Sequence, residues 1–225
     1  KIKRMGADAV KVLAWYRPDA EEKIVKAQQD YVQKIGEECA KYDILFLFEL
    51  LVYPLKKDEH QTQEYIEMKN KKTEHVLRSV EEFANEKYRV DLFKLESPVN
   101  VKQLNDNDLS LFKEMGTLAR KPWVMLSAGA GKKEFKKVLK LAFKAGSSGF
   151  LAGRAIWLDA FHHYPDWGKV KHQLENSSRS YLSEIGLIAE KQALPWINHN
   201  YYSIEGSKFP YQNSEFRNLY KESIL

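Results

Sequence analysis

The sequence predicts an α/β fold in which helices cover a parallel β-sheet. Short apolar runs rich in Val, Leu, Ile and Phe alternate along the chain with long amphipathic segments, and such alternation is typical of a strand-helix repeat. The repeat unit is about 30 to 40 residues long, as in parallel α/β proteins. With 225 residues, of which 44% are hydrophobic, the chain can bury a sizeable core.

Five apolar runs are predicted as strands because they are short and rich in strand-forming residues. The segments between them carry apolar residues at three- and four-residue spacing, which indicates helices with one buried face. The predicted strands cover residues 8–15, 44–53, 90–96, 122–127 and 148–152. The predicted helices cover residues 19–41, 60–87, 106–119 and 132–145, and a further helix begins near Arg154.

Charged side chains interrupt three of these apolar runs. Lys94 lies in VDLFKLESPVN, and Glu96 follows on the same side of the strand. Lys11 lies in ADAVKVLAWY and Glu49 in YDILFLFELLVYP. Any one of them could snorkel to water or form a structural pair, but three together predict a functional site. A buried ammonium must be paired, neutralised or used, and a neutral lysine is a nucleophile for carbonyl groups.

Glycine-rich turns follow the last two predicted strands, in LSAGAG and GFLAGRAIW. Gly129, Gly131 and Gly153 allow a ligand to approach the backbone, and the helices that follow present N–H groups to an anion. Arg154 adds a charge-assisted donor. Paired turns of this kind commonly hold a phosphate in (β/α)8 barrels, although tight turns without a ligand are an equal alternative for either one alone. GAGKK lacks the spacing of a Walker motif.

Five motifs in order carry a family resemblance: AVKVL, FELLVYP, LFKLESPVN, WVMLSAG and GFLAGRAIW. Together they resemble the class I tagatose 1,6-bisphosphate aldolase family, including the related 6-deoxy-6-sulfofructose 1-phosphate aldolases, from about Gly6 to Trp157. The resemblance implies a (β/α)8 TIM barrel, of which residues 1–165 supply about the last five βα units. We expect the other three in a longer protein, or else in a partner. Residues 166–225 are expected to form a C-terminal helix and an aromatic-rich, irregular tail.

The resemblance also implies a role for each site residue. Lys94 is the expected Schiff-base lysine, Glu49 the general acid/base and Lys11 a second active-site lysine. The positions that contact the C1 phosphate are matched by Ser127, Gly129, Gly153 and Arg154. Because an iminium serves as the electron sink, the expected chemistry needs neither a cofactor nor a metal. The adjacent His162 and His163 are weak metal candidates.

The expected activity is therefore cleavage of a ketose 1,6-bisphosphate, such as tagatose 1,6-bisphosphate, to dihydroxyacetone phosphate and glyceraldehyde 3-phosphate. One alternative is a 6-deoxy-6-sulfofructose 1-phosphate aldolase that gives dihydroxyacetone phosphate and sulfolactaldehyde. WYRPDA and GFLAGRAIW favour that branch, whereas FELLVYP and SPVN favour the tagatose branch. A second alternative is a non-catalytic, phosphate-sensing regulatory protein.

Composition narrows the range of partners. The net charge is +5, but the lysines are interspersed with glutamates, as on solvated helix faces, so we expect no nucleic-acid partner. An apolar run of about 18 residues is absent, so we expect no membrane partner either. The single cysteine, Cys39, favours a cytoplasmic location. We expect a homo-oligomer. In the tail, five aromatic residues are expected to pack on the barrel or on a neighbouring subunit: Tyr201, Tyr202, Phe209, Tyr211 and Phe216.

Overall fold

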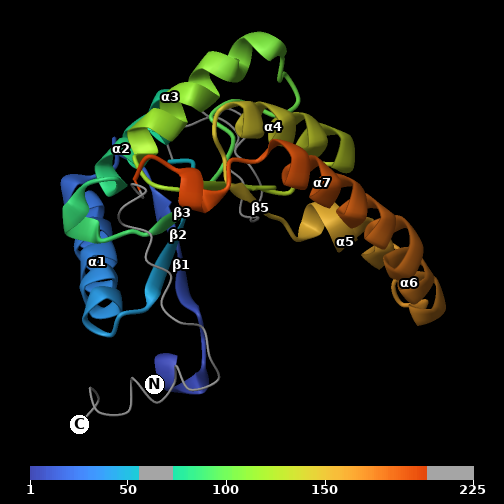
Figure 1. Ribbon diagram of the computed structural model, residues 1–225, viewed down its shortest axis with the longest axis horizontal. Coiled ribbons are helices and arrows are strands. Elements are labelled where there is room, and N and C mark those ends of the chain that lie inside the picture. The colour runs from blue at the N-terminus through green and yellow to red at the C-terminus, as the bar shows by residue number, and fades with distance from the viewer. Residues whose placement is uncertain (56–72, 202–225) are drawn as a thin grey trace.

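The computed structural model describes residues 1–55 and 73–201, and within them five parallel strands form one sheet (Figure 1). The strands are β1 (Ala9–Tyr16), β2 (Leu45–Val52), β3 (Leu92–Leu95), β4 (Trp123–Leu126) and β5 (Gly149–Leu151). They lie in chain order, each paired in parallel with the next. Every predicted run overlaps one of these strands, and β1 extends one residue beyond its run, so the predicted parallel sheet is confirmed.

The helices form an arc around the strands (Figure 1). The helices that alternate with the strands are α1 (Glu22–Lys41), α2 (Thr73–Phe83), α3 (Leu109–Ala119), α4 (Lys132–Lys144) and α5 (Arg154–Phe161). The helix predicted over residues 106–119 begins with a 3-10 turn, Asp106–Asp108, because the side chains of Asn105 and Asp108 form a capping box there. Residues 60–72 of the second predicted helix lie outside the described residues.

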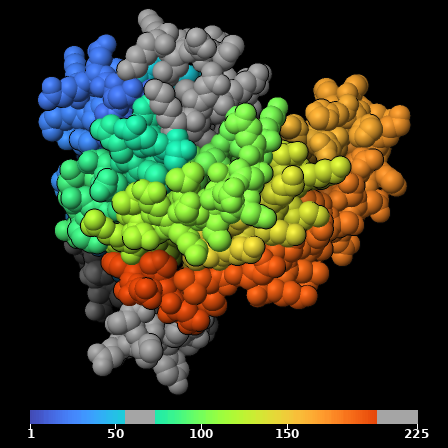
Figure 2. All heavy atoms as spheres, turned by 90° about the horizontal axis from the view of Figure 1, so that it is seen from above, coloured from blue at the N-terminus to red at the C-terminus, as the bar shows by residue number. Residues whose placement is uncertain are grey.

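The chain continues after α5 as a mainly helical segment. It forms α6 (Trp167–Gln173), a π-helical turn (Leu174–Ser178) and α7 (Arg179–Gln192). Helix α7 lies along α4 and buries Ile185 completely (Figure 2). Beyond it, Tyr201 lies against Lys121, whose ammonium donates to the Tyr201 hydroxyl at 3.1 Å. The other four tail aromatics, Tyr202, Phe209, Tyr211 and Phe216, lie outside the described residues.

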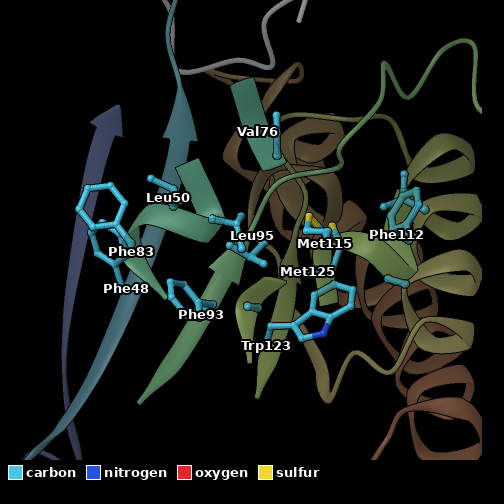
Figure 3. Packing of buried hydrophobic residues seen from close by; sticks show 14 of the residues in the cluster. Phe48, Leu50, Val76, Phe83, Phe93, Leu95, Phe112, Met115, Trp123 and Met125 are labelled. Atoms are coloured by element: carbon cyan, nitrogen blue, oxygen red, sulfur yellow. The ribbon is translucent and has the colours of Figure 1, made fainter. Parts of the chain in front are cut away.

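The main core lies between the sheet and its helices (Figure 3). Alternate strand residues point toward the helices, among them Phe48 on β2, Phe93 on β3 and Trp123 on β4. Phe83 of α2 packs against Phe48 with the ring centroids 4.9 Å apart. Full burial of a large apolar side chain contributes roughly 1.5–3 kcal/mol, so this face fixes the position of every strand.

The opposite face of the sheet carries a smaller apolar cluster. Its buried members are Leu51, Leu126 and Ala128, with Leu13 and Trp15 packed against them. On the same face Leu45 and Leu151 are 39% and 42% exposed. Among the residues described, no helix combines the length and the apolar character that crossing a bilayer requires.

Two glycines inside helices allow a matched test of how closely the helices pack against the rest of the chain. A Cβ on Gly36 of α1 would collide with the carbonyl oxygen of Tyr88 and lie 2.9 Å from its carbonyl carbon, whereas a Cβ on Gly186 of α7 would meet nothing within 4 Å. We expect Gly36→Ala to lower the free energy of unfolding by about 2–3 kcal/mol through overpacking. Gly186→Ala should raise it by up to ~1 kcal/mol. Urea unfolding of both variants tests this, and equal midpoints would contradict the packing described.

Candidate active site

Three charged side chains from neighbouring strands meet on the inner face of the sheet, which is the face that points away from the helices. The register places Glu49 of β2 directly opposite Lys94 of β3 and Leu13 of β1. Lys94 Nζ lies 2.9 Å from Glu49 Oε1, and Lys11 Nζ lies 2.8 Å from Glu49 Oε2. The structure therefore brings together the three residues that interrupt the apolar runs, with Glu49 between the two lysines.

The three side chains differ in their exposure to solvent. Glu49 is 2% exposed, Lys94 18% and Lys11 50%. A carboxylate buried to this degree needs cationic partners to compensate for lost hydration, and it has one on each oxygen. The 2.9 Å between Lys94 Nζ and Glu49 Oε1 is within the distance of a direct proton transfer. Lys94 is thus largely sheltered from solvent and has a carboxylate in contact.

Glu96 is also buried, just beyond the last residue of β3. Its Oε1 accepts a hydrogen bond from the backbone N–H of Val52 at 2.7 Å. This contact joins the end of β3 to the end of β2. It therefore helps to hold the strand that carries Lys94 beside the strand that carries Glu49.

The turn after β4 has the backbone conformation that its glycines suggest. Ala128 and Gly129 both have positive φ, 44° and 79°, and the N–H of Ala130 donates to the carbonyl oxygen of Ser127 at 2.7 Å. Gly131 is the N-cap of α4, and no described side chain caps the helix there. The first N–H groups of a helix are suited to an anion, and in this turn the Glu134 carboxylate also lies close to Gly131, with Oε2 2.5 Å from the place of a Cβ there.

The turn after β5 is built in a similar way. Gly153 is the N-cap of α5, again without a side-chain cap among the described residues. A Cβ at Gly153 would lie 3.3 Å from Trp157 Nε1, so this position has little space for a larger residue. Arg154, half-buried, is the first residue of α5.

The register brings these two turns to the same edge of the sheet. Leu126 of β4 is paired with Leu151 of β5, so Ser127, Gly129 and Gly153 all follow neighbouring strand ends. Lys94 is paired with Val124, on the strand that leads into the first turn. In parallel α/β proteins, ligands bind at this carboxyl edge.

A cluster that the sequence did not predict joins the ends of β1 and β2. Arg17, only 1% exposed, donates from Nη1 to the carbonyl oxygen of Tyr53 at 2.8 Å. Its Nε and Nη2 contact both carboxylate oxygens of Asp19 at 2.8 and 3.1 Å, and His75 Nε2 lies 3.7 Å from Asp19 Oδ1. The sequence feature that could have indicated this cluster is WYRPD, in which a charged pair, Arg17 and Asp19, directly follows an apolar strand.

The described residues contain no group of three His, Cys, Asp and Glu side chains placed to hold a metal ion. His162 and His163 follow α5 at the surface, where both are exposed.

Comparison with known proteins identifies relatives for most of the chain. The sequence model of the DeoC/LacD family aldolases matches residues 1–159. Tagatose 1,6-diphosphate aldolase of Lactococcus lactis subsp. lactis is 30% identical over 213 residues, which cover 88% of this chain and 64% of that protein. The enzyme of the same name from Listeria monocytogenes serotype 4a (strain HCC23) is 31% identical over 211 residues, covering 87% and 62%. The chain thus spans less than two-thirds of the length of these relatives.

Solved structures of aldolases share the fold. A Schiff base-forming fructose-1,6-bisphosphate aldolase superimposes with a TM-score of 0.54 at 13% identity, covering 82% of this chain and 60% of that one. Fructose-bisphosphate aldolase from Plasmodium falciparum gives a TM-score of 0.55 at 13% identity, covering 88% and 59%. At such identities the likeness establishes the fold alone, which is a partial TIM-barrel arrangement.

The unequal burial of the charged trio predicts unequal effects on stability. Glu49→Gln would leave two lysines without their shared anion, so we expect the free energy of unfolding to fall by about 3 kcal/mol. Lys11→Met removes a half-exposed ion-pair partner and should cost less than about 1 kcal/mol. Urea unfolding of the two variants measures the difference. If Lys11→Met lowered the free energy of unfolding as much as Glu49→Gln, the charged trio would not be organised around the carboxylate.

Proposed function

Because the chain belongs to the DeoC/LacD family of aldolases, we propose that the protein is a class I aldolase acting on a ketose 1,6-bisphosphate such as tagatose 1,6-bisphosphate. Its products would be dihydroxyacetone phosphate and glyceraldehyde 3-phosphate. The names of the curated relatives support this substrate. We further infer a cytoplasmic location, since the lone cysteine, Cys39, is a buried free thiol, and we propose a homo-oligomer.

The contact between Lys94 and Glu49 carries this proposal. A lysine nucleophile requires a base that takes its proton and a site that shelters the resulting amine from water. Both are present, because the Glu49 carboxylate is 2.9 Å from Lys94 Nζ and both side chains are largely buried.

In the first half of the proposed reaction Lys94 forms an imine. Its ammonium passes a proton to Glu49, and the neutral nitrogen adds to the C2 carbonyl of the sugar to give a carbinolamine. Glu49 returns the proton to the C2 hydroxyl, which leaves as water. The product is a protonated imine, positively charged and next to the carboxylate that has just been restored.

In the second half the imine accepts electrons from the breaking C3–C4 bond. Glu49 takes the proton of the C4 hydroxyl as that bond breaks, so an aldehyde leaves and an enamine remains on Lys94. Glu49 then protonates C3, and water hydrolyses the imine to release dihydroxyacetone phosphate. Lys11, 2.8 Å from the other carboxylate oxygen, stabilises the ionised form of Glu49 whenever a proton must leave it.

We assign the C1 phosphate to the two glycine turns. The ends of the neighbouring strands β4 and β5 are followed by Ser127, Gly129, Gly153 and Arg154, and β4 is paired with the strand of Lys94. Two helix N-termini and a guanidinium are suited to a dianion. An anchor there would hold C2 of the substrate near the reactive amine, so that the addition becomes intramolecular.

Imine trapping tests the activity directly. The full-length protein is incubated with dihydroxyacetone phosphate and borohydride, and its intact mass and peptide map are determined. We expect one reduced adduct, located on Lys94, because borohydride reduces the imine to a stable secondary amine. No adduct on full-length protein would favour a phosphate-sensing protein, and an adduct on Lys11 instead would reverse the roles of the two lysines.

A substitution of the nucleophile separates chemistry from anchoring. Lys94→Arg keeps the positive charge beside Glu49 but cannot form an imine, so turnover should fall by at least about a thousandfold. Inorganic phosphate should bind with a dissociation constant within about twofold of wild type, because the proposed anchor lies on β4 and β5. Activity assay and calorimetry measure the two quantities. Equal losses of both would overturn this division of roles.

A further inference from the structure

Lys132 is the first residue of α4 and directly follows the glycine turn after β4. Neither its sequence motif nor the proposed reaction assigns it a role. In the structure, however, three other segments of the chain hold it: α5, α7 and the π-helical turn between α6 and α7.

The backbone of Lys132 is held by α7. Tyr181 donates its hydroxyl proton to the carbonyl oxygen of Lys132 at 2.8 Å. Tyr181 is buried, and this burial, followed by the nearby charges of Glu184 and Glu134, raises its pKa to about 12. Its hydroxyl is therefore a donor at every physiological pH, and it fixes the start of α4 from outside the barrel.

The side chain of Lys132 reaches α5. Its ammonium lies 2.9 Å from Asp159 Oδ2, on the helix that begins at the second glycine turn. It also donates to Ser177 Oγ at 3.3 Å, and Ser177 lies within the π-helical turn. An extra residue in a helical turn shifts the side chains that follow, and such turns often occur at functional sites. Lys132 thus connects the two helices whose N-termini follow the glycine turns.

We propose that Lys132 is a positioning residue that sets the distance between the N-termini of α4 and α5, with Tyr181 and Asp159 as its two anchors. The inference rests on the proposed phosphate site at those N-termini. A phosphate that accepts hydrogen bonds from both helices requires them to lie within a few tenths of an ångström of one arrangement. The tether through Lys132 acts on that arrangement and leaves the Lys94 and Glu49 pair untouched.

A direct attraction between the Lys132 charge and phosphate is the rival explanation, and Asp159→Asn distinguishes the two. If Lys132 attracts phosphate by its charge alone, then removing the negative Asp159 should strengthen binding. If Lys132 acts by tethering the helices, the same change should weaken binding, because the connection to α5 is lost. Tyr181→Phe changes no charge and should also weaken binding only under the tethering mechanism.

An ion pair between α4 and α7 offers a matched control. Lys136 Nζ lies 2.7 Å from Glu184 Oε1, one helical turn further from the glycine turn. Its side chains are 34% and 50% exposed, against 24% and 64% for Lys132 and Asp159. Lys136→Met therefore removes a comparable surface ion pair and the same charge, but it leaves the start of α4 unchanged.

The test is calorimetric titration of the full-length protein and its variants with inorganic phosphate at constant ionic strength. We expect Lys132→Met, Asp159→Asn and Tyr181→Phe each to raise the dissociation constant by roughly three- to tenfold, the equivalent of one lost hydrogen bond. Lys136→Met should stay within about twofold, and Lys132→Arg should restore binding to about the same range. Melting temperatures show whether each variant is folded.

Three results would overturn the proposal. Tighter binding by Asp159→Asn would establish direct charge attraction, unchanged binding by Tyr181→Phe would remove the backbone anchor, and equal losses in Lys136→Met and Lys132→Met would show a general effect of the α4 and α7 contact. These comparisons use phosphate alone and do not require an imine. If borohydride trapping on Lys94 fails while the dissociation constants for phosphate change as expected, the proposed activity is wrong and the tether through Lys132 is supported.

Discussion

The buried carboxylate of Glu49 is the constraint on which the rest of the inner sheet face depends. A carboxylate that has lost its water must be compensated by cations at hydrogen-bond distance, and Lys94 and Lys11 supply them from the strands on either side. This arrangement requires three parallel strands in one register. The apolar cluster of Leu51 and Leu126 on the same face lowers the local polarity and so strengthens both attractions.

The outer face of the sheet, which is covered by the helices, fixes that register. Phe48 on β2 and Phe93 on β3 lie one residue away from the charged positions and are completely buried beneath the helices, as is Phe46. Since side chains alternate across a strand, a slip by one residue would put Glu49 into this aromatic core and a phenylalanine into the site. The hydrophobic free energy gained by burying the phenylalanines under the helices therefore prevents a slip that would bury the Glu49 carboxylate away from its lysines.

The same alternation explains how far the sequence could predict the site. A charge within an apolar run is visible in one segment alone, so Lys94, Glu49 and Lys11 could be identified. Period two placed Lys94 and Glu96 on the same side of their strand, but the register that brings Glu49 beside both lysines appears only in the structure. Contacts between side chains that are far apart in the sequence and meet only in the folded chain could not be predicted. His75 approaches Asp19 from a distant helix. Lys132 belongs to GAGKK, which looks like an ordinary solvated helix face until Tyr181 and Asp159 are placed beside it.

The two halves of the proposed site hold charge by different means, and the difference follows from the chemistry. An ammonium placed beside the substrate phosphate would be drawn to that dianion, which would then compete with Glu49 for the lysines. Backbone N–H groups at Gly131 and Gly153 bind an anion through fixed dipoles and cannot transfer a proton to it. The ammonium of Lys132, although close to the turn, is already engaged by Asp159. Lys94 and Lys11 consequently keep Glu49 as their common partner, and the proton that Lys94 must lose has the Glu49 carboxylate within reach.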